Sequence, residues 1–417
     1  LFLENTHSLT EIVKMLVDHG INVNLKDNEE RTALVYACAS GDLDSLKYLH
    51  QNGADLFVED SMKDTLLSSA ARHTTLLKYL VDNGLKVNHA NVNGLTPLFQ
   101  TISCSNRDGT RYLIERGADI DALTIQHATP IHAAVLKGDV EIVKLLLELN
   151  ADLSIKCIFG NTAISASYNN LEIIKLFAEE FGGLKDGETK NGITKSKFTY
   201  IFFNFSPSIY TIHVFVVDDD LRKQWTRTFL FAASKGCLEN LRFLCDSGLA
   251  QVIDKDEANA FTALHNACSN GHYDVAVYLI ENGADVNVKN VNGDVPLCFA
   301  ANSGYLDIVK LLMEHGAELD VPNHHGTTGL YAAAANGHLK TVEFLYENGA
   351  NVNVVDADGD TPLHDAAHNG HLSVVQYLVL HRANTSIRNK NKKTALDLAV
   401  DQGNQDVVDF LTIHENV

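Results

Sequence analysis

The fold of this chain is indicated by one stretch near its C-terminal end, which reads Asp358-Gly359-Asp360-Thr361-Pro362-Leu363-His364-Asp365-Ala366-Ala367-His368-Asn369-Gly370-His371-Leu372. Asp358-Gly359 is a turn signal, because glycine tolerates positive φ. Thr361 can cap a helix N-terminus through its hydroxyl, and Pro362 then lies at the first helical position, where its missing N–H costs nothing. Gly370 fits the left-handed residue that ends a helix. The stretch therefore predicts a turn followed by a short helix.

A box of the Thr-x-Leu type recurs along the chain at an almost constant spacing. Successive boxes are 33, 31, 33 and 33 residues apart, then 100, and then 33 four times, with starts at Thr32, Thr65, Thr96, Thr129, Thr162, Thr262, Val295, Thr328, Thr361 and Thr394. A period near 33 residues indicates one supersecondary unit stacked many times. We therefore expect a solenoid with long surfaces, and not a closed globule with a catalytic pocket.

A second amphipathic segment follows each box. After Gly370, apolar residues recur with helical spacing at Leu372, Val374, Val375, Leu378 and Val379. The corresponding segments elsewhere end in Gly-Ala pairs such as Gly283-Ala284, and the turn tips carry pairs such as Asn292-Gly293. One such unit cannot bury its apolar face alone, so stacking of neighbouring units must complete the core.

Several units depart from this pattern. The spacing of 31 residues after Thr65 predicts a second helix about two residues short in that repeat. Val295 replaces the capping threonine, which should weaken that cap by roughly 1 kcal/mol. A degenerate box is expected at Arg227-Thr228-Phe229-Leu230, with Ala232-Ala233 and Gly236 behind it.

The units resemble ankyrin repeats. The resemblance rests on boxes followed by alanine, glycine and a Gly-Ala ending, namely Thr361-Pro362-Leu363-His364, Thr262-Ala263-Leu264-His265 and Thr129-Pro130-Ile131-His132. It implies an all-α ankyrin-repeat solenoid of helix-turn-helix units with short β-hairpin or turn tips. About 12 repeats are implied, the first truncated and one degenerate, over almost the whole chain.

Three parts are expected along the chain. Residues 1–181 form an N-terminal ankyrin repeat block, residues 182–226 an insert or degenerate repeat, and residues 227–417 a C-terminal ankyrin repeat block. The middle part has the length of one repeat but lacks its alanine pair and glycine, so an inserted loop, a decayed repeat and non-native sequence such as a translated intron all stay open. A transmembrane helix is disfavoured there, because the apolar run is interrupted at Asn204, Pro207 and His213.

Charge limits the class of partner that is expected, and cysteine content limits the expected compartment. The chain has 417 residues, a net charge of -20 and a pI of about 5.3, which favours basic or neutral partners over nucleic acid and anionic membranes. The seven cysteines include no C-x-x-C pair, and Cys38 and Cys268 occupy positions where other repeats have alanine. They are expected to be reduced and buried. The chain also opens without a signal-peptide pattern. We therefore expect a cytoplasmic protein, with the nucleus as the alternative compartment.

The sequence lacks several common catalytic motifs. The sequence contains no G-x-x-x-x-G-K-[ST], H-E-x-x-H or G-x-S-x-G motif, and no G-x-G-x-x-G after a strand. The resemblance implies a structural role for the box residues His132, His265 and His364. The adjacent His324 and His325 lack a third ligand, so we expect no metal there. The prediction is a non-enzymatic chain without catalytic residues, metal, cofactor or small-molecule substrate.

The resemblance also implies where a partner protein binds, because ankyrin repeats usually contact partners through their turn tips and the first-helix residues just before the glycine. Plain solvent exposure is the alternative interpretation for each such residue. On the first helices, Tyr331, Phe299 and Phe231 are either partner anchors or core residues. In the better-formed C-terminal block, the predicted protein-binding residues are Asn259, Ser269, Asn270, Asn292, Asn302, Ser303, His324, His325, Asn336, Asp358, His368 and Asn369.

These patterns predict a protein-interaction scaffold or adaptor in signalling, which holds a basic or extended protein partner on its concave face and turn tips. The alternative is the regulatory ankyrin portion of a larger protein, such as an ion channel, a kinase or a ubiquitin-ligase substrate receptor. The chain opens inside a repeat, with Leu1 at the position of Leu34, which favours this alternative. Neither hypothesis includes nucleic acid binding or insertion of this chain into a membrane.

Overall fold

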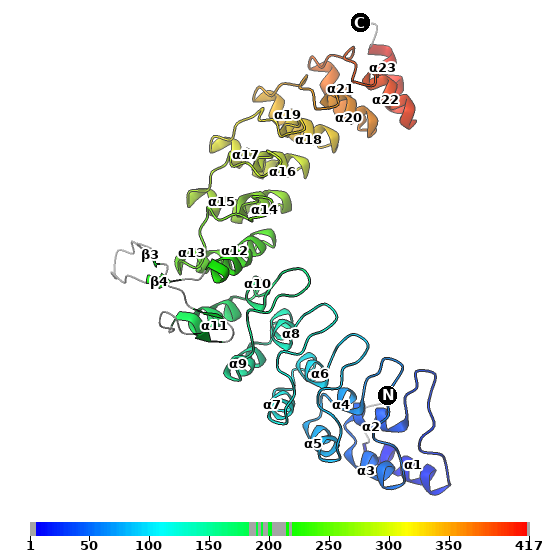
Figure 1. Ribbon diagram of the computed structural model, residues 1–417. Helices are drawn as coiled ribbons and strands as arrows, with labels where there is room; N and C mark the ends of the chain where they lie inside the picture. The colour runs from blue at the N-terminus through cyan, green and yellow to red at the C-terminus, as the bar shows by residue number, and fades with distance from the viewer. Residues whose placement is uncertain are drawn as a thin grey trace. The chain divides into compact units, whose positions relative to one another are not determined.

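The computed structural model describes residues 6–182, 189–190, 193–194, 199–201, 214–216 and 219–414. The chain divides into two compact units, residues 1–200 with 216–224, and residues 201–215 with 225–417. The division falls within one helix, α12 (Asp219–Ser234). Within each unit, pairs of short helices follow one another in sequence order and are joined by turn tips (Figure 1).

The first unit consists of a lone helix and five helix pairs. The helices are α1 (Thr6–Asp18), α2 (Ala33–Ser40), α3 (Leu43–Gln51), α4 (Leu66–Ser69), α5 (Thr74–Asp82), α6 (Pro97–Ser103), α7 (Arg107–Glu115), α8 (Pro130–Lys137), α9 (Val140–Glu148), α10 (Ala163–Ala166) and α11 (Leu171–Gly182). α1 takes the place of the second helix in the truncated first repeat and packs against α3. Two antiparallel strands follow α11, β1 (Thr189–Lys190) and β2 (Ile193–Thr194), with Thr189 opposite Thr194 and Lys190 opposite Ile193.

The second unit repeats the same helix pair. After α12 come α13 (Leu238–Asp246), α14 (Ala263–Asn270), α15 (Tyr273–Glu281), α16 (Pro296–Asn302), α17 (Leu306–Glu314), α18 (Gly329–Ala335), α19 (Leu339–Glu347), α20 (Pro362–His368), α21 (Leu372–Leu380), α22 (Ala395–Gln402) and α23 (Gln405–His414). A second short sheet pairs β3 (Thr199–Ile201) with β4 (Val214–Val216). The predicted all-α repeat solenoid is confirmed.

The helix boundaries follow the capping signals of the sequence. Thr361 has extended backbone, its hydroxyl accepts the N–H of His364, and Pro362 occupies the first turn of α20. Gly271 ends α14 with a φ of 78° and donates its N–H to Ala267 O, the left-handed conformation that glycine adopts without steric cost. Val295 makes no side-chain cap, as expected.

The core lies between successive first helices and the second helices behind them. In α20, Leu363, Ala366 and Ala367 are buried, and full burial of one leucine side chain stabilises the fold by roughly 1.5–3 kcal/mol. The small alanines let neighbouring first helices approach closely. Cys38 and Cys268 are buried in this layer as predicted, and burial raises the pKa of the Cys38 thiol to about 12.

The turn tips of each unit form a ladder of backbone hydrogen bonds. In the first unit, an N–H of each tip donates to a carbonyl of the preceding tip at 2.9–3.1 Å, in the pairs Ser61–Glu29, Val92–Met62, Ile125–Asn93 and Ile158–Gln126. In the second unit, the same bonds measure 2.7–3.0 Å in Val291–Asn259, His324–Asn292, Ala357–His325 and Lys390–Asp358. The ladder fixes the tips in register, which makes each row of tips an ordered surface.

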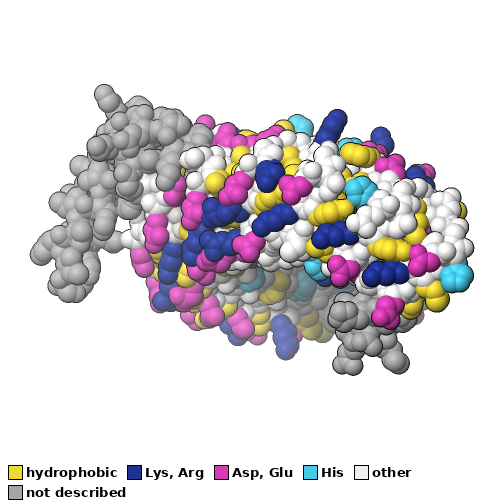
Figure 2. Space-filling model, turned by 90° about the horizontal axis from the view of Figure 1, so that it is seen from below, with side chains coloured by type: hydrophobic (Ala, Val, Ile, Leu, Met, Phe, Trp, Pro, Cys, Tyr) yellow, Lys and Arg dark blue, Asp and Glu magenta, His cyan; other side chains and the backbone are white. Residues whose placement is uncertain are grey.

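Opposite charges pair between neighbouring second helices of the first unit. Arg107 lies 2.7 Å from Glu141, and Arg111 lies 3.2 Å from Glu148. Because these side chains are 41–57% exposed, each pair contributes little to stability, about 0–1 kcal/mol. Cationic and anionic side chains are interspersed over the face seen in Figure 2.

Two local expectations were wrong. In the repeat of Thr65, the second helix α5 keeps nine residues and the first helix α4 has only four, because α5 packs against its neighbours over its full length while α4 ends at Ala70 without a glycine. The degenerate box at 227–230 starts no helix. α12 begins at Asp219 and runs through the box, so Thr228 is buried in mid-helix.

The division of the chain at 181 and 226 stays a prediction, since most residues between these limits lie outside the described part. Within the part of the chain that the structure describes, no helix is both long and apolar enough for a membrane span.

Candidate protein-binding face

The twelve residues predicted to bind a partner lie in two rows of the second unit, one at each end of the first helices, and we call the two rows together the binding face. The helix-end row lies at the C-terminal ends of α14, α16, α18 and α20, and comprises Ser269, Asn270, Asn302, Ser303, Asn336, His368 and Asn369. The tip row comprises Asn259, Asn292, His324, His325 and Asp358. None of the twelve is buried. Ser269 and Ser303 are half-buried, and the other ten are exposed.

Side-chain hydrogen bonds between repeats join members of the helix-end row. The Ser303 hydroxyl donates to Ser269 O at 3.2 Å. The Asn336 amide donates to Asn302 Oδ1 at 3.0 Å, and the Asn369 amide donates to Ala335 O at 2.9 Å. The repeat spacing therefore places these residues side by side, and part of their polarity is used to hold the stack together.

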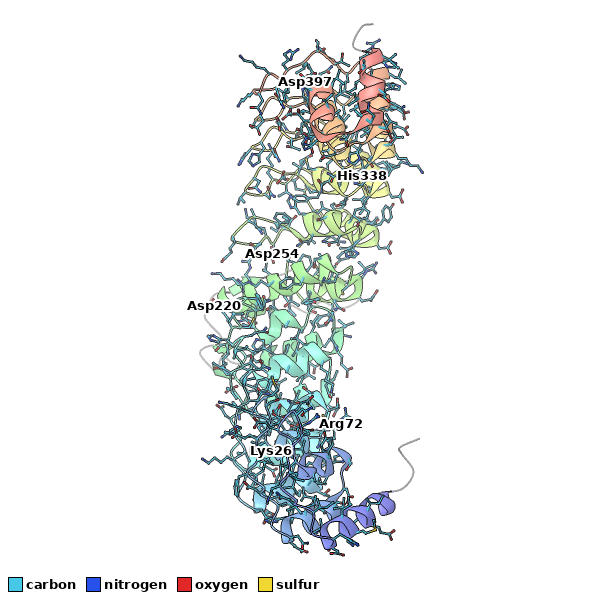
Figure 3. All side chains as sticks on the ribbon, turned by 90° about the vertical axis from the view of Figure 1, so that its right-hand side faces the viewer. Lys26, Arg72, Asp220, Asp254, His338 and Asp397 are labelled. Carbon is cyan, nitrogen blue, oxygen red and sulfur yellow. The ribbon has the colours of Figure 1, made fainter. Side chains whose placement is uncertain are left out.

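A row of histidines, which the sequence analysis did not single out, supports the helix-end row from behind. Nε2 of His338, labelled in Figure 3, donates to Asn302 O at 2.9 Å, and His371 donates to Ala335 O at 3.1 Å. His272 makes the equivalent bond to Ser234 O at 2.9 Å. Each bond satisfies a carbonyl at the end of a first helix, where no intrahelical partner exists. The signal was present in the sequence as the histidine that directly follows the helix-ending glycine.

The tip row differs from the helix-end row, because several of its side chains form no hydrogen bond or ion pair within the described residues. The tips of Asn292, His325 and Asp358 are bonded through backbone atoms only. Within the described residues, no side-chain hydrogen bond or ion pair is formed by these three residues. Their side chains are exposed, so they can bind another molecule without breaking a contact of the fold.

Carboxylates give this end of the binding face a negative potential. The Tyr331 hydroxyl donates to Asp356 Oδ2 at 3.1 Å. Burial raises the pKa of Asp365, the hydrogen bond from Tyr331 lowers it, and the charges of Asp360 and Asp356 raise it again. Burial is also the main cause that raises the pKa of Tyr331. A cationic side chain placed here would relieve the repulsion between the carboxylates.

The aromatic residues of the first helices belong mainly to the core. Tyr331 is 4% exposed. Phe299 is half-buried, with its ring centroid 5.0 Å from that of Phe261 and 5.6 Å from that of His265. Phe231 is also half-buried. These contacts favour packing over the role of partner anchors.

The box histidines have the structural role that the resemblance implied. His265 Nδ1 lies 2.9 Å from the Thr262 hydroxyl, and its Nε2 donates to Asp294 O at 3.2 Å in the next repeat. His132 and His364 make the same pair of contacts. Burial lowers the pKa of His132 and of His265. Within the described residues, no group of three His, Cys, Asp or Glu side chains is placed to hold a metal ion.

Comparison with known proteins gives the same repeat. A family model of ankyrin repeats (3 copies) matches residues 2–60, 52–124, 204–290, 285–356 and 330–417, and a second model of ankyrin repeats (many copies) matches residues 105–147. These matches cover both blocks of boxes.

Three curated relatives share short stretches with the chain. Ankyrin repeat protein nuc-2 of Neurospora crassa is 36% identical over 83 residues, 20% of this chain and 8% of that protein. Ankyrin repeat domain-containing protein 63 of Mus musculus is 34% identical over 107 residues, 24% of this chain and 27% of that protein. Protein phosphatase 1 regulatory subunit 27 of Homo sapiens is 45% identical over 65 residues, 16% of this chain and 41% of that protein. The chain thus spans less than half the length of each.

The family-model matches and the structure both indicate the same repeated unit. Boxes, caps, helix pairs and tip ladders recur in register through the described residues, and the family models match most of the chain. The chain belongs to the ankyrin repeat family.

Proposed function

We propose that this chain is a non-enzymatic scaffold or adaptor that binds a partner protein on its binding face. Ankyrin repeats indicate protein–protein interaction, and Protein phosphatase 1 regulatory subunit 27 shows a related stretch in a protein named as a regulatory subunit. The observation that carries the proposal is the tip row. Hydrogen bonds between tips hold it rigid, while Asn292, His325 and Asp358 present free, exposed side chains.

The rigidity of the tip row has an energetic consequence. A partner that binds an ordered surface orders few additional side chains, and the cost of ordering side chains is a main reason why buried area does not convert into affinity. Because the carboxylates of Asp356, Asp360 and Asp365 lie close enough to interact at this part of the surface, we propose a basic or extended partner segment there. We place this activity in the cytoplasm or nucleus, where free cysteines such as the buried Cys38 and Cys268 stay reduced.

A second candidate function is regulation within a longer protein. The match to ankyrin repeat protein nuc-2 covers only 8% of that protein, so similar repeats occur there within a much larger chain. Under this alternative, the binding face would contact another domain or a regulator of the same protein. The face and its chemistry are the same in both cases, and the identity of the bound molecule separates them.

The test is quantitative capture of partners from lysate with the full chain as bait, at low and raised salt. The test variant combines Asn292→Arg, His325→Glu and Asp358→Arg, which changes the net charge by +2 without removing a contact of the fold. The control is Glu281→Arg, which makes the same charge change on the exposed end of α15. Partners of the binding face should be retained by the control at raised salt and lost by the test variant. Equal retention by both variants would refute the proposal.

A further inference from the structure

The tip of the last repeat is basic, although the block around it is acidic. Residues 228–417 carry a net charge of -13 and eleven Lys and Arg residues, of which four lie within six positions of the chain. They are Arg388, Lys390, Lys392 and Lys393, and we call residues 388–393 the basic hairpin. Such a concentration of one charge on one turn sets this tip apart from the other tips of the unit.

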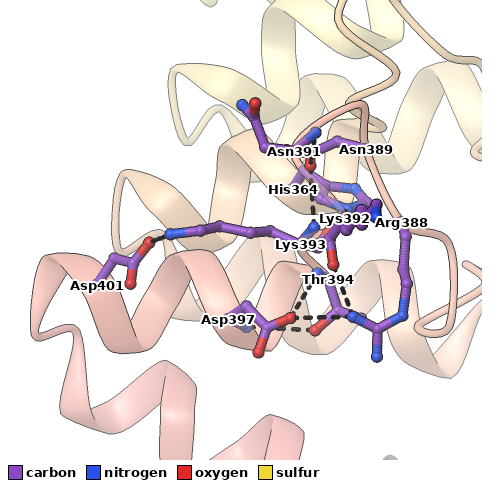
Figure 4. Close-up of polar contacts among 9 residues, drawn as sticks. All are labelled: His364, Arg388, Asn389, Asn391, Lys392, Lys393, Thr394, Asp397 and Asp401. Atoms are coloured by element: carbon purple, nitrogen blue, oxygen red, sulfur yellow. Dashed lines mark hydrogen bonds and ion pairs between the residues drawn. The ribbon is translucent and has the colours of Figure 1, made fainter.

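The basic hairpin is held rigidly from within, as Figure 4 shows. Asn389 is 6% exposed, and its Oδ1 accepts the N–H groups of Asn391 and Lys393, both at 3.0 Å. Its amide donates to Asp360 Oδ1 at 2.8 Å on the preceding tip. His364 Nε2 donates to Lys393 O at 3.1 Å. The cations are therefore presented on an ordered backbone.

Two of the four cations are neutralised within the last repeat. Arg388 lies 3.4 Å from Asp397, and Lys393 forms an ion pair with Asp401. Lys390 and Lys392 are exposed, and within the described residues neither forms an ion pair. These two ammonium groups flank Asn391 and remain available to an external anion.

Lys392 also adopts a strained backbone. Its φ is 62°, in the left-handed region, where the three preceding tips place Gly293, Gly326 and Gly359. A side chain at such a position costs energy that glycine avoids. Lys63 and Ala260 have the same left-handed φ at the equivalent positions of their tips, so this strain is not specific to the basic hairpin.

One backbone acceptor of the basic hairpin has no partner among the described residues. Lys390 N–H donates to Asp358 O at 2.9 Å, as each tip does to the tip before it. The acceptor that would serve a further rung is the carbonyl of Asn391, and no described residue donates to it. Asn391 is exposed. An extended peptide could therefore donate a backbone N–H to Asn391 O, in the way that peptides add to an exposed strand edge.

We propose that the basic hairpin binds a short, extended, acidic segment of the partner protein. One backbone N–H of the segment would donate to Asn391 O, and carboxylates on either side would pair with Lys390 and Lys392. This inference rests on the proposed function, because it names the chemistry of one part of the partner.

The surrounding charges favour a short peptide over a long polyanion. The preceding tip carries Asp356, Asp358 and Asp360, and α23 carries the exposed Asp406 and Asp409. Charges interact over about 8 Å at physiological ionic strength, so a nucleic acid strand or an anionic bilayer that reached the hairpin would also meet these carboxylates. A segment with two or three acidic residues can contact the two lysines without this repulsion.

Fluorescence anisotropy with the full chain tests the proposal. The probe is a labelled hexapeptide in which three Asp residues alternate with Ser, and the matched control peptide replaces the three Asp with Asn. The acidic peptide should bind at least about tenfold more tightly than the neutral peptide at physiological salt. Phosphatidylserine vesicles and a single-stranded oligothymidine serve as competing ligands. Tighter binding of either than of the acidic peptide would overturn the proposal.

Charge reversal locates the site. Lys390→Glu with Lys392→Glu should weaken binding of the acidic peptide by about tenfold or more, while Lys255→Glu with Lys340→Glu makes the same charge change at exposed positions elsewhere in the unit and should leave it nearly unchanged. Equal weakening by both pairs would mean that net charge alone attracts the peptide, and would contradict the inference. If the unmodified chain binds the acidic and the neutral peptide equally, while partners are still captured through the binding face, this inference is rejected and the proposed function stands. If the acidic peptide binds at the two lysines but the binding-face variant and its control retain partners equally, the proposed function is rejected and the peptide site stands.

Discussion

The first three boxes of the first unit differ from the histidine-containing boxes of the second unit in whether the threonine hydroxyl has a hydrogen-bond partner. In the second unit, the Thr262 and Thr361 hydroxyls lie 2.9 and 2.8 Å from Nδ1 of the histidine three positions later. In the first unit, the hydroxyls of Thr32, Thr65 and Thr96 are buried and have no hydrogen-bond partner among the described residues. The fourth position of these boxes holds valine, serine or phenylalanine.

This difference teaches that a histidine at the fourth position supplies a partner for the buried box hydroxyl, which the hydroxyls of Thr32, Thr65 and Thr96 lack. A buried hydroxyl without a partner costs about 1–3 kcal/mol. In a stacked repeat protein, stability is approximately a sum over repeats and their interfaces. We therefore expect the repeats of Thr32, Thr65 and Thr96 to be the least stable part of the first unit, and to unfold before the second unit.

The largest effect is expected from truncating a core leucine in each region. Leu98 in α6 and Leu363 in α20 are both buried, and replacement by alanine should cost about 2–5 kcal/mol in either case. Because the N-terminal repeats start from lower stability, Leu98→Ala should produce a separate unfolding transition at low urea concentration. Circular dichroism measures this transition. Leu363→Ala should shift the main transition. A single shared transition for both variants would contradict the proposed difference in stability between the two regions. Leu123→Ala, at an exposed leucine, serves as the control.

The same substitution should have opposite consequences in the two regions. Thr361→Val removes the hydroxyl that lies 2.8 Å from His364 Nδ1 and should destabilise the protein by about 1–3 kcal/mol. Thr32→Val removes an unpartnered hydroxyl, and Thr32 already has the extended backbone that valine prefers, so it should be neutral or slightly stabilising. The two variants are compared by urea unfolding. Similar losses for both would show that the Thr32 hydroxyl is satisfied in solution.

A smaller gain is expected at a tip of the first unit. Lys63 has a φ of 62°, and Lys63→Gly should relieve this strain and stabilise the first unit by about 0.5–1 kcal/mol. Gly94, with a φ of 75°, provides the reverse control, because a Cβ there would lie 2.9 Å from Thr124 Cα. Gly94→Ala should therefore lower the thermal midpoint. A lower midpoint for Lys63→Gly would contradict the assignment of strain.

The smallest effect is a dependence of stability on pH. Burial lowers the pKa of His132 and His265 below 6.5 in the folded state, so the unfolded state binds protons first as the pH falls. The contribution of these residues is present above pH 6.5 and is lost as the pH falls through the lowered pKa. Unfolding free energy should decrease from pH 7.5 to pH 5, and His265→Gln should reduce that slope. An unchanged slope in the variant would exclude His265 as its source.

Much of the fold could be predicted because its signals are local. Thr361, Pro362 and Gly271 each act on their own backbone, so the helix boundaries at these residues follow from the residue type. The two errors arose where packing decides. Which of the two helices is shorter in the 31-residue repeat of Thr65 depends on packing against the neighbouring repeats. The start of α12 at Asp219 depends on contacts beyond its own box.

The positions of the twelve residues on the repeats could be predicted, and the hydrogen bonds between them could not. The contact of Asn336 with Asn302 depends on the distance between repeats, which no single repeat encodes. The basic hairpin was overlooked for another reason. Its signal, four cations between Arg388 and Lys393, is present in the sequence. The net charge of the whole chain is negative and does not reveal a local cluster of cations.

Hydrogen–deuterium exchange of the full chain, free and bound to a captured partner, tests the central claim most directly. If the partner binds the binding face, backbone amides in the tips at 258–259, 291–292, 324–325 and 357–358 should exchange more slowly in the complex, while those of the second helices α15, α17 and α19 should be unchanged. Slower exchange confined to the second helices, or to the first unit, would contradict the account.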